Sequence, residues 1–427
     1  MGTLSIPLAQ VVSEYPWVTD GITPNEWRAL ANVRQVAETD LPLGVKLAGL
    51  PWVSDEISDD ELGALRSIRA LWKVNRQLAK TVVDMPFLRE DIRDSDRNTL
   101  RLLVDLSKDD PRALATITEQ DWFKDGLDNA GAAFVVVLAR HTRFDPSRTD
   151  NPASFDRLVT NYFVDQRTVP LKLAGNVALY GFYVDRKTDT KNFMDQMEQS
   201  VQIMEDFMGE AFPRKDVILL FASTDEERIL GLNLGTHMVV TPEAQADDER
   251  FKVIVHEIAH YYWKGASSDS PEDGVPFWFQ EGGSDFMASY VFSQVSHPLS
   301  ESLAERRRKT DASTSEQWWC KRRLGVVGLD QLNAKLAAEG FTKHRKSPQL
   351  RCHYALGEEF FLNLYDVLGH NPFASAWREI YLLTLTKKSP VAEQEVHDIF
   401  LSHAPPDKIE AFNQVYESLH GGSFSGY

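Results

Sequence analysis

Two histidines and a glutamate stand close together in KVIVHEIAHYYW, residues 252–263. His256, Glu257 and His260 have the order His-Glu-x-x-His. Residues four apart share one face of an α-helix, so both imidazoles can reach a single ion, with Glu257 beside its open coordination position. The pattern favours a zinc site in which the carboxylate acts as base on a water. A chance pair of histidines in a buried helix is the alternative.

A catalytic zinc needs a third protein ligand. Residues 276–292, PFWFQEGGSDFMASYVF, are helical in pattern and place Glu281 and Asp285 on one face. We expect Glu281 to be the third ligand and Asp285 to orient one histidine. Gly282 and Gly283 would let this helix approach the histidine helix closely. The competing carboxylates lie in the preceding polar loop: Asp269, Glu272 and Asp273.

These motifs resemble those of the gluzincin zinc metallopeptidases, the clan of thermolysin and the M1 aminopeptidases. HEIAH is followed by W-x-x-E-G at Trp278, Glu281 and Gly282, and the E-x-x-S-D segment is similar to the thermolysin branch. The resemblance covers about residues 160–400. It implies one Zn²⁺ per chain, an α+β thermolysin-like catalytic domain, and hydrolysis of a peptide or protein substrate.

A further segment, beginning at Tyr354, resembles the part of M1 enzymes in which Y-x-x-G opens a helix and the tyrosine faces the zinc. The resemblance implies that Tyr354 donates a hydrogen bond to the substrate carbonyl oxygen as negative charge builds on it. His353 is the alternative donor, because thermolysin-like enzymes use a histidine there. A tyrosine that merely begins a core helix is the third interpretation.

The segment before the histidine helix bears on specificity. Residues 235–240 predict an edge strand that can pair with an extended peptide. His237 on this strand would either line the cleft or lie at the surface. The G-x-M-E-N signature with which M1 enzymes bind a free amino group does not occur in the sequence. Cleavage within a chain is therefore favoured slightly over aminopeptidase activity.

Strand and helix patterns precede these motifs. Residues 159–173 and 176–185 predict strands because they are rich in Val, Tyr and Phe, and residues 216–223 predict a buried strand. Residues 188–212 predict an amphipathic helix whose methionines fill the core. Together these elements predict an α+β catalytic domain over residues 157–427.

The first 140 residues contain a repeat with a 35-residue period. Each repeat predicts a helix pair that must stack on its neighbours, which gives a short α-solenoid. Capping boxes are expected at Thr23 and Ser58. Further helix caps are expected at Asp40, Asn75 and Asp110. The expected core aromatics are Trp17, Trp52, Phe87 and Trp122. Trp27 and Trp72 fall outside the repeat register, and the sequence does not place them in the core or at the surface. Residues 141–156 are polar and predict a linker between the two domains.

Composition excludes several classes of partner. The net charge is −17, from 46 basic and 63 acidic residues, which argues against a nucleic-acid or anionic-membrane surface. The sequence contains no apolar run of the roughly 18 residues that a transmembrane helix needs. The first residues also lack the pattern of a signal peptide. If Cys320 and Cys352 pair, the bridge would hold the segment carrying Tyr354, and an extracytoplasmic location would be favoured.

A different class of function stays open. The chain could be a binding or scaffold protein that recruits a protein partner through its helical repeats, with an inactive zincin fold. Glu257 argues against this reading, because a purely structural zinc site does not need a general base.

Overall fold

The computed structural model divides the chain into two compact units. The first contains Met1–Arg167, Tyr180–Thr188 and Lys215–Leu220, and the second contains Thr168–Leu179, Asp189–Arg214 and Phe221–Tyr427. The described residues are 5–144, 163–183, 190–221, 230–240, 247–263, 274–295, 300–310, 312, 315–338, 351–387 and 389–422. Most of the expected linker, from residue 145 onward, lies outside them.

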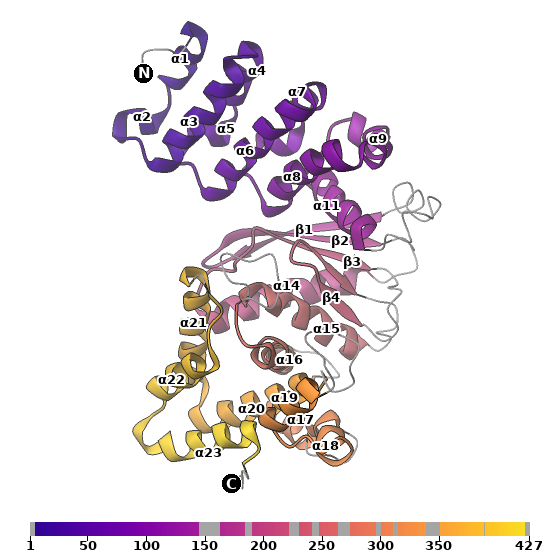
Figure 1. Cartoon of the computed structure of the whole chain (residues 1–427), viewed down its shortest axis with the longest axis vertical. Coiled ribbons are helices and arrows are strands. Elements are labelled where there is room, and N and C mark those ends of the chain that lie inside the picture. Colours follow the sequence, from indigo (N-terminus) through magenta and orange to yellow (C-terminus); the bar gives the residue numbers. More distant parts are fainter. Residues whose placement is uncertain are drawn as a thin grey trace. The chain divides into compact units, whose positions relative to one another are not determined.

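The first unit consists mainly of short helices that follow one another along the chain (Figure 1). Their bounds are α1 Ile6–Val12, α2 Pro16–Asp20, α3 Pro24–Ala37, α4 Leu41–Ala48, α5 Pro51–Ser54, α6 Asp59–Val74, α7 Arg76–Val83, η1 Pro86–Arg89, α8 Asp94–Asp109, α9 Pro111–Thr118, α10 Asp121–Lys124 and α11 Asn129–Phe144. Thr23 and Ser58 form reciprocal capping boxes with Glu26 and Glu61. The side chains of three further caps accept backbone N–H bonds: Asp40, Asn75 and Asp110. The sequence therefore predicted these helix starts correctly.

The aromatic anchors differ from expectation at one position. Trp17, Trp52 and Phe87 are buried, whereas Trp122 is only half-buried. The fourth core position is filled by the neighbouring Phe123, which is 2% exposed. The short helix α10 presents consecutive residues to different sides, so its second aromatic residue takes the inward position.

The two tryptophans outside the repeat register also differ from each other. Trp27 is 61% exposed. Trp72 is buried, and its Nε1 donates to the Thr39 hydroxyl at 3.1 Å. The hydroxyl satisfies the N–H of the buried indole.

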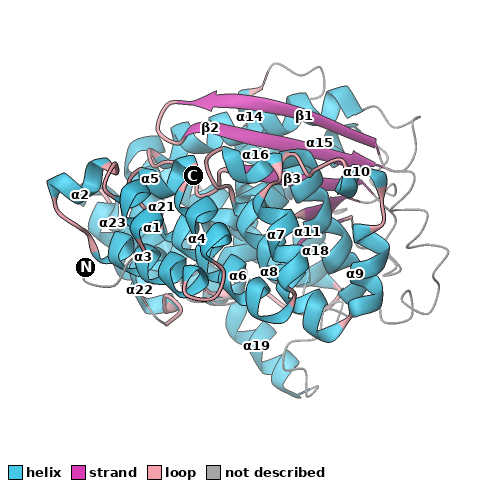
Figure 2. Ribbon diagram, turned by 90° about the horizontal axis from the view of Figure 1, so that it is seen from above, coloured by secondary structure: helices cyan, strands magenta, loops and turns pink. Residues whose placement is uncertain are grey.

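A five-stranded sheet has the strand order β1-β2-β3-β5-β4, and Figure 2 shows β1, β2 and β3 side by side. The strands are β1 Phe163–Leu171, β2 Gly175–Tyr183, β3 Asp216–Phe221, β4 Gly231–Asn233 and β5 Met238–Val240. The prediction of an edge strand at 235–240 is wrong. β5 is fully buried between β3 and β4, and the edge belongs to β4, which pairs antiparallel with β5.

The second unit consists mainly of helices. Four of them are used in the arguments below: α14 Thr190–Met208, α15 Asp247–Ala259, α16 Phe277–Gln294 and α20 Arg351–Leu368. The others are η2 His260–Tyr262, α17 Leu303–Thr310, α18 Glu316–Arg322, α19 Leu329–Ala338, α21 His370–Thr386, α22 Glu393–His403, η4 Pro406–Lys408 and α23 Ile409–His420. Almost every residue of α16 is buried, and Figure 1 shows it between α15 and α20. Within the described part of the chain, no helix is long and apolar enough to cross a membrane.

A buried carboxylate fixes the turn between β1 and β2. Glu205 on α14 accepts hydrogen bonds from the backbone nitrogens of Lys172, Leu173 and Ala174, at 2.8, 3.1 and 2.8 Å. One side chain thus satisfies three successive backbone N–H groups of the turn. The carboxylate therefore ties the hairpin to the helix.

Glu205→Gln is expected to destabilise the protein by about 1–3 kcal/mol, because the amide turns a donor toward backbone N–H groups. Urea denaturation followed by tryptophan fluorescence measures the change. Asp206→Asn is the matched control, since Asp206 contacts the same turn only through an exposed ion pair with Lys172. A loss as small as that of the control would contradict the anchoring role.

Candidate metal centre

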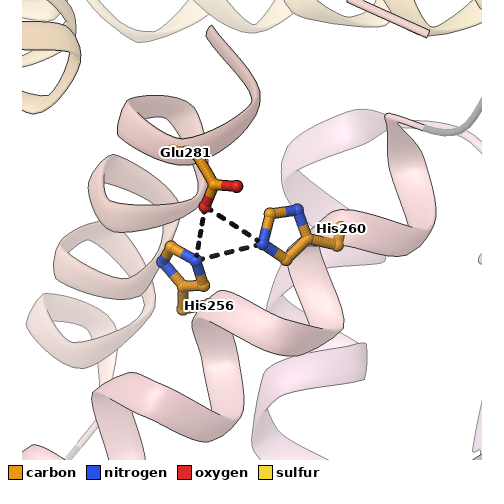
Figure 3. Close-up of side chains that lie close together, drawn as sticks. All are labelled: His256, His260 and Glu281. Atoms are coloured by element: carbon orange, nitrogen blue, oxygen red, sulfur yellow. Dashed lines mark hydrogen bonds and ion pairs between the residues drawn. The ribbon is translucent and has the colours of Figure 1, made fainter. Parts of the chain in front are cut away.

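Three potential ligand atoms converge in the second unit (Figure 3). His256 lies near the end of α15, and His260 is the first residue of η2, which follows α15 directly in the sequence. Their Nε2 atoms are 3.0 Å apart. Oε2 of Glu281, on α16, lies 3.3 Å from the first and 3.5 Å from the second. The structure therefore brings together the three residues that the sequence predicted as ligands.

The donor set fits a tetrahedral zinc ion. With metal–ligand bonds of about 2.0–2.1 Å, ligand atoms at tetrahedral corners are roughly 3.3 Å apart. The observed separations of 3.0 to 3.5 Å bracket that value. All three side chains are buried, and Nδ1 of His260 has no hydrogen-bond partner within the part of the chain that the structure describes. Two imidazoles and one carboxylate are also the ligand types that zinc prefers.

A second carboxylate orients the first histidine. Oδ1 of Asp285 lies 2.7 Å from Nδ1 of His256, so Nδ1 donates its proton to this carboxylate, and Nε2 faces Glu281. Burial alone lowers the pKa of His256, but the Asp285 charge and hydrogen bonds with Asp285 and Glu281 raise it well above its usual value. Burial raises the pKa of Glu281, but the two histidines bring it well below its usual range. A cation here would therefore compete with a proton for His256.

Asp285→Asn is expected to weaken zinc binding by about 10- to 100-fold, because the amide can present its N–H to the histidine and favour the wrong tautomer. Competition with a chromophoric chelator measures the affinity. Asp330→Asn is the control, since Asp330 makes the same kind of contact with His420, at 3.0 Å, outside the cluster. Equal affinities for both variants would remove the orienting role.

Glu257 is buried against the edge strand. A Cβ on Gly231 of β4 would lie 2.5 Å from Cγ1 of Val253 and 2.6 Å from Oε1 of Glu257, so the glycine lets β4 approach α15 closely. The Asn233 side chain donates to the Glu257 carbonyl oxygen at 2.6 Å. Sequence analysis missed both β4 residues because a three-residue strand is too short to show periodicity. The carboxylate expected to act as a base therefore lies beside a strand edge.

Tyr354 lies in the first turn of α20 and faces the cluster. Its ring stacks on His256 with 5.8 Å between centroids, and its hydroxyl hydrogen bonds with Glu281. Burial, followed by the charge of Glu281 and this hydrogen bond, raises the tyrosine pKa well above its usual value. The half-buried side chain therefore stays protonated and able to donate a hydrogen bond.

The sequence singled out five further residues as candidates. His353 is buried, with its ring edge-on to Phe277 at 5.1 Å. His237 is completely buried before β5, with Nδ1 3.2 Å from the Thr236 hydroxyl, so a surface position is wrong. The competing carboxylates of the polar loop lie outside the described residues: Asp269, Glu272 and Asp273.

Two glycines bring Tyr354 close to the ligands. A Cβ on Gly282 would lie 2.4 Å from the Cα of Gly357, and one on Gly357 would lie 2.4 Å from the Trp278 carbonyl oxygen. The expectation that Gly282 serves the approach of the histidine helix is therefore wrong. Its backbone contacts α20 instead. Gly283 makes only ordinary contacts.

Gly282→Ala is expected to destabilise the protein by about 1–3 kcal/mol or more, because the added methyl forces two helix backbones apart. Gly283→Ala is the matched control: its Cβ would meet neighbouring atoms no closer than 3.5 Å. Alanine should even favour the helix there. Thermal melting of both variants measures the difference, and equal melting temperatures would contradict the close packing.

A disulfide joins Cys320 on α18 to Cys352 on α20, with Cα atoms 5.8 Å apart. Both cysteines are completely buried. Because Cys352 precedes Tyr354 by two residues, the bridge fixes the beginning of the helix turn that carries the tyrosine.

Comparisons with known proteins found similarity in structure alone. No family model matches the sequence, and no curated protein does. A mutant of a two-domain M1 zinc metallopeptidase bound to L-arginine has a TM-score of 0.40 and 12% identity, over 62% of this chain. An M1 zinc metallopeptidase from Deinococcus radiodurans has a TM-score of 0.38 at the same identity and coverage. The chain covers 53% of each of these proteins, so it spans about half their length.

Proposed function

We propose that this chain is a zinc-dependent peptidase. The observation that carries the proposal is the triangle of ligand atoms from His256, His260 and Glu281, with separations of 3.0 to 3.5 Å. Glu257 and Tyr354 supply a base and a hydrogen-bond donor at the same place. A structural zinc site needs neither group and usually has four protein ligands.

Each side chain has a distinct role in this proposal. A bound zinc ion would supply an acidic water and polarise the substrate carbonyl group. Glu257 accepts a proton from the attacking water and passes it to the leaving amine nitrogen. Tyr354 donates a hydrogen bond to the carbonyl oxygen as its negative charge grows. Asp285 keeps the proton on Nδ1 of His256 throughout.

We further propose that cleavage occurs within the substrate chain. An extended peptide would pair with β4, the last strand in the order of the sheet that the structure describes, which places its backbone beside Glu257. The missing G-x-M-E-N signature supports this choice over aminopeptidase activity. The 35-residue helical units would form a repeat array that binds a protein partner, and the disulfide favours an extracytoplasmic location.

The test compares zinc-loaded wild type with Glu257→Gln on an unfolded, labelled protein substrate. The variant should retain zinc and lose about 10²- to 10⁴-fold in turnover, because the base is removed and the ligands are not. Glu249→Gln, an exposed residue on the same helix, is the control and should keep wild-type activity. Bound metal is measured by atomic emission.

Peptides with free and acetylated N-termini distinguish the modes of cleavage. Equal turnover of both supports internal cleavage, and turnover of the free peptide alone would establish an aminopeptidase. If wild type and Glu257→Gln both bind zinc and neither cleaves any substrate, the enzyme proposal fails. The chain would then be better described as a binding protein with an inactive zincin fold.

A further inference from the structure

A second buried carboxylate lies on α20, one turn after Tyr354. Glu358 is 2% exposed and is surrounded by donors from three other helices. Arg306 on α17 forms a two-pronged ion pair with it, through Nε at 2.6 Å and Nη2 at 2.7 Å. Ser289 on α16 donates to Oε1 at 2.9 Å, and Gln317 on α18 lies 3.4 Å from Oε2.

The same group of residues also holds the backbone of the preceding turn. Nε2 of Gln317 donates to the Ala355 carbonyl oxygen at 3.2 Å, directly after Tyr354. Because residues four apart share a helix face, Glu358 and Tyr354 lie one above the other on α20. Any rotation of this turn that moves the tyrosine ring would therefore pull Glu358 away from Arg306.

We propose that Arg306, Gln317 and Glu358 are positioning residues that hold the hydroxyl of Tyr354 at the metal centre. Arg306 and Gln317 act through Glu358 and the Ala355 carbonyl oxygen, and neither touches the substrate. For its kinetic consequence the inference rests on the proposed peptidase function. The restraint on the helix turn is independent of that function.

A neighbouring ion pair provides the contrast. Arg307, also on α17, pairs with Asp366 on α20, so both pairs join the same two helices. The Asp366 side chain is 44% exposed, and it lies three turns beyond Tyr354. Glu358, by comparison, is buried, and both of its carboxylate oxygens accept hydrogen bonds. The Arg306–Glu358 pair therefore has a defined geometry that the exposed Arg307–Asp366 pair lacks.

The experiment is a double-mutant cycle on the zinc-loaded full chain. Arg306→Gln is expected to lower kcat by about 10- to 100-fold with KM nearly unchanged, because a small displacement of an oriented group is costly. In a Tyr354→Phe background, the same change should lower kcat less than about twofold, since the two effects are coupled. Arg307→Gln should alter kcat less than twofold in both backgrounds. Zinc content should be unchanged throughout.

Amide hydrogen exchange supplies a readout that does not depend on turnover. Residues 351–358 should exchange faster in Arg306→Gln than in wild type, while residues 250–262 and the whole of Arg307→Gln remain unchanged. If Arg306→Gln does not fold, Arg306→Met combined with Glu358→Leu replaces the pair by apolar side chains, a change that buried pairs often tolerate. This double variant should show the same faster exchange at 351–358.

The outcomes separate the two proposals. Equal losses of kcat in the tyrosine and phenylalanine backgrounds, or unchanged exchange at residues 351–358, would overturn the positioning role. An inactive wild type would overturn the peptidase proposal alone, and the exchange data would then decide the positioning role by themselves.

Discussion

The backbone contact between Gly282 and Gly357 is the constraint on which the candidate site depends. It sets the distance between α16, which carries Glu281, and α20, which carries Tyr354. A Cβ at either glycine would lie 2.4 Å from the backbone of the other helix, so any side chain there would push the helices apart. Helix formation alone disfavours both glycines, so their presence reflects the need for this contact.

Carboxylates and imidazoles alternate at the candidate metal centre. The carboxylate of Asp285 faces one nitrogen of His256, and the carboxylate of Glu281 faces the other. Buried charges are costly unless each has a partner. The imidazoles provide those partners. Glu358 is likewise a buried carboxylate with a charged partner. Its negative charge is offset by the positive charge of Arg306.

The sequence predicted the parts of the site that depend on spacing within one helix. His256 and His260, and Glu281 and Asp285, lie four residues apart, and helical geometry places each pair on one face. Contacts between helices were harder to foresee. The partner of Gly282 could not be identified because a glycine carries no side-chain pattern that points to its neighbour.

The other differences between the sequence-based predictions and the structure have two causes: a strand too short to recognise, and adjacent residues of similar type. β4 contains only three residues, so neither Gly231 nor its contact with Glu257 could be inferred. At Trp122 and Phe123, two adjacent aromatic residues compete for one core position, and composition cannot rank them. The helix caps, in contrast, were predictable because a side chain three residues from its target needs no tertiary information.

One face of α16 carries three consecutive contacts at four-residue intervals. Glu281 faces the histidines, Asp285 orients one of them, and Ser289 reaches Glu358 on α20. Inserting a single residue early in this helix would rotate everything beyond it by about 100°. Metal binding, histidine orientation and support of the tyrosine therefore all depend on the same helical spacing along α16. Substitutions on its other faces would preserve this spacing, whereas an insertion or deletion within the helix would disrupt all three contacts.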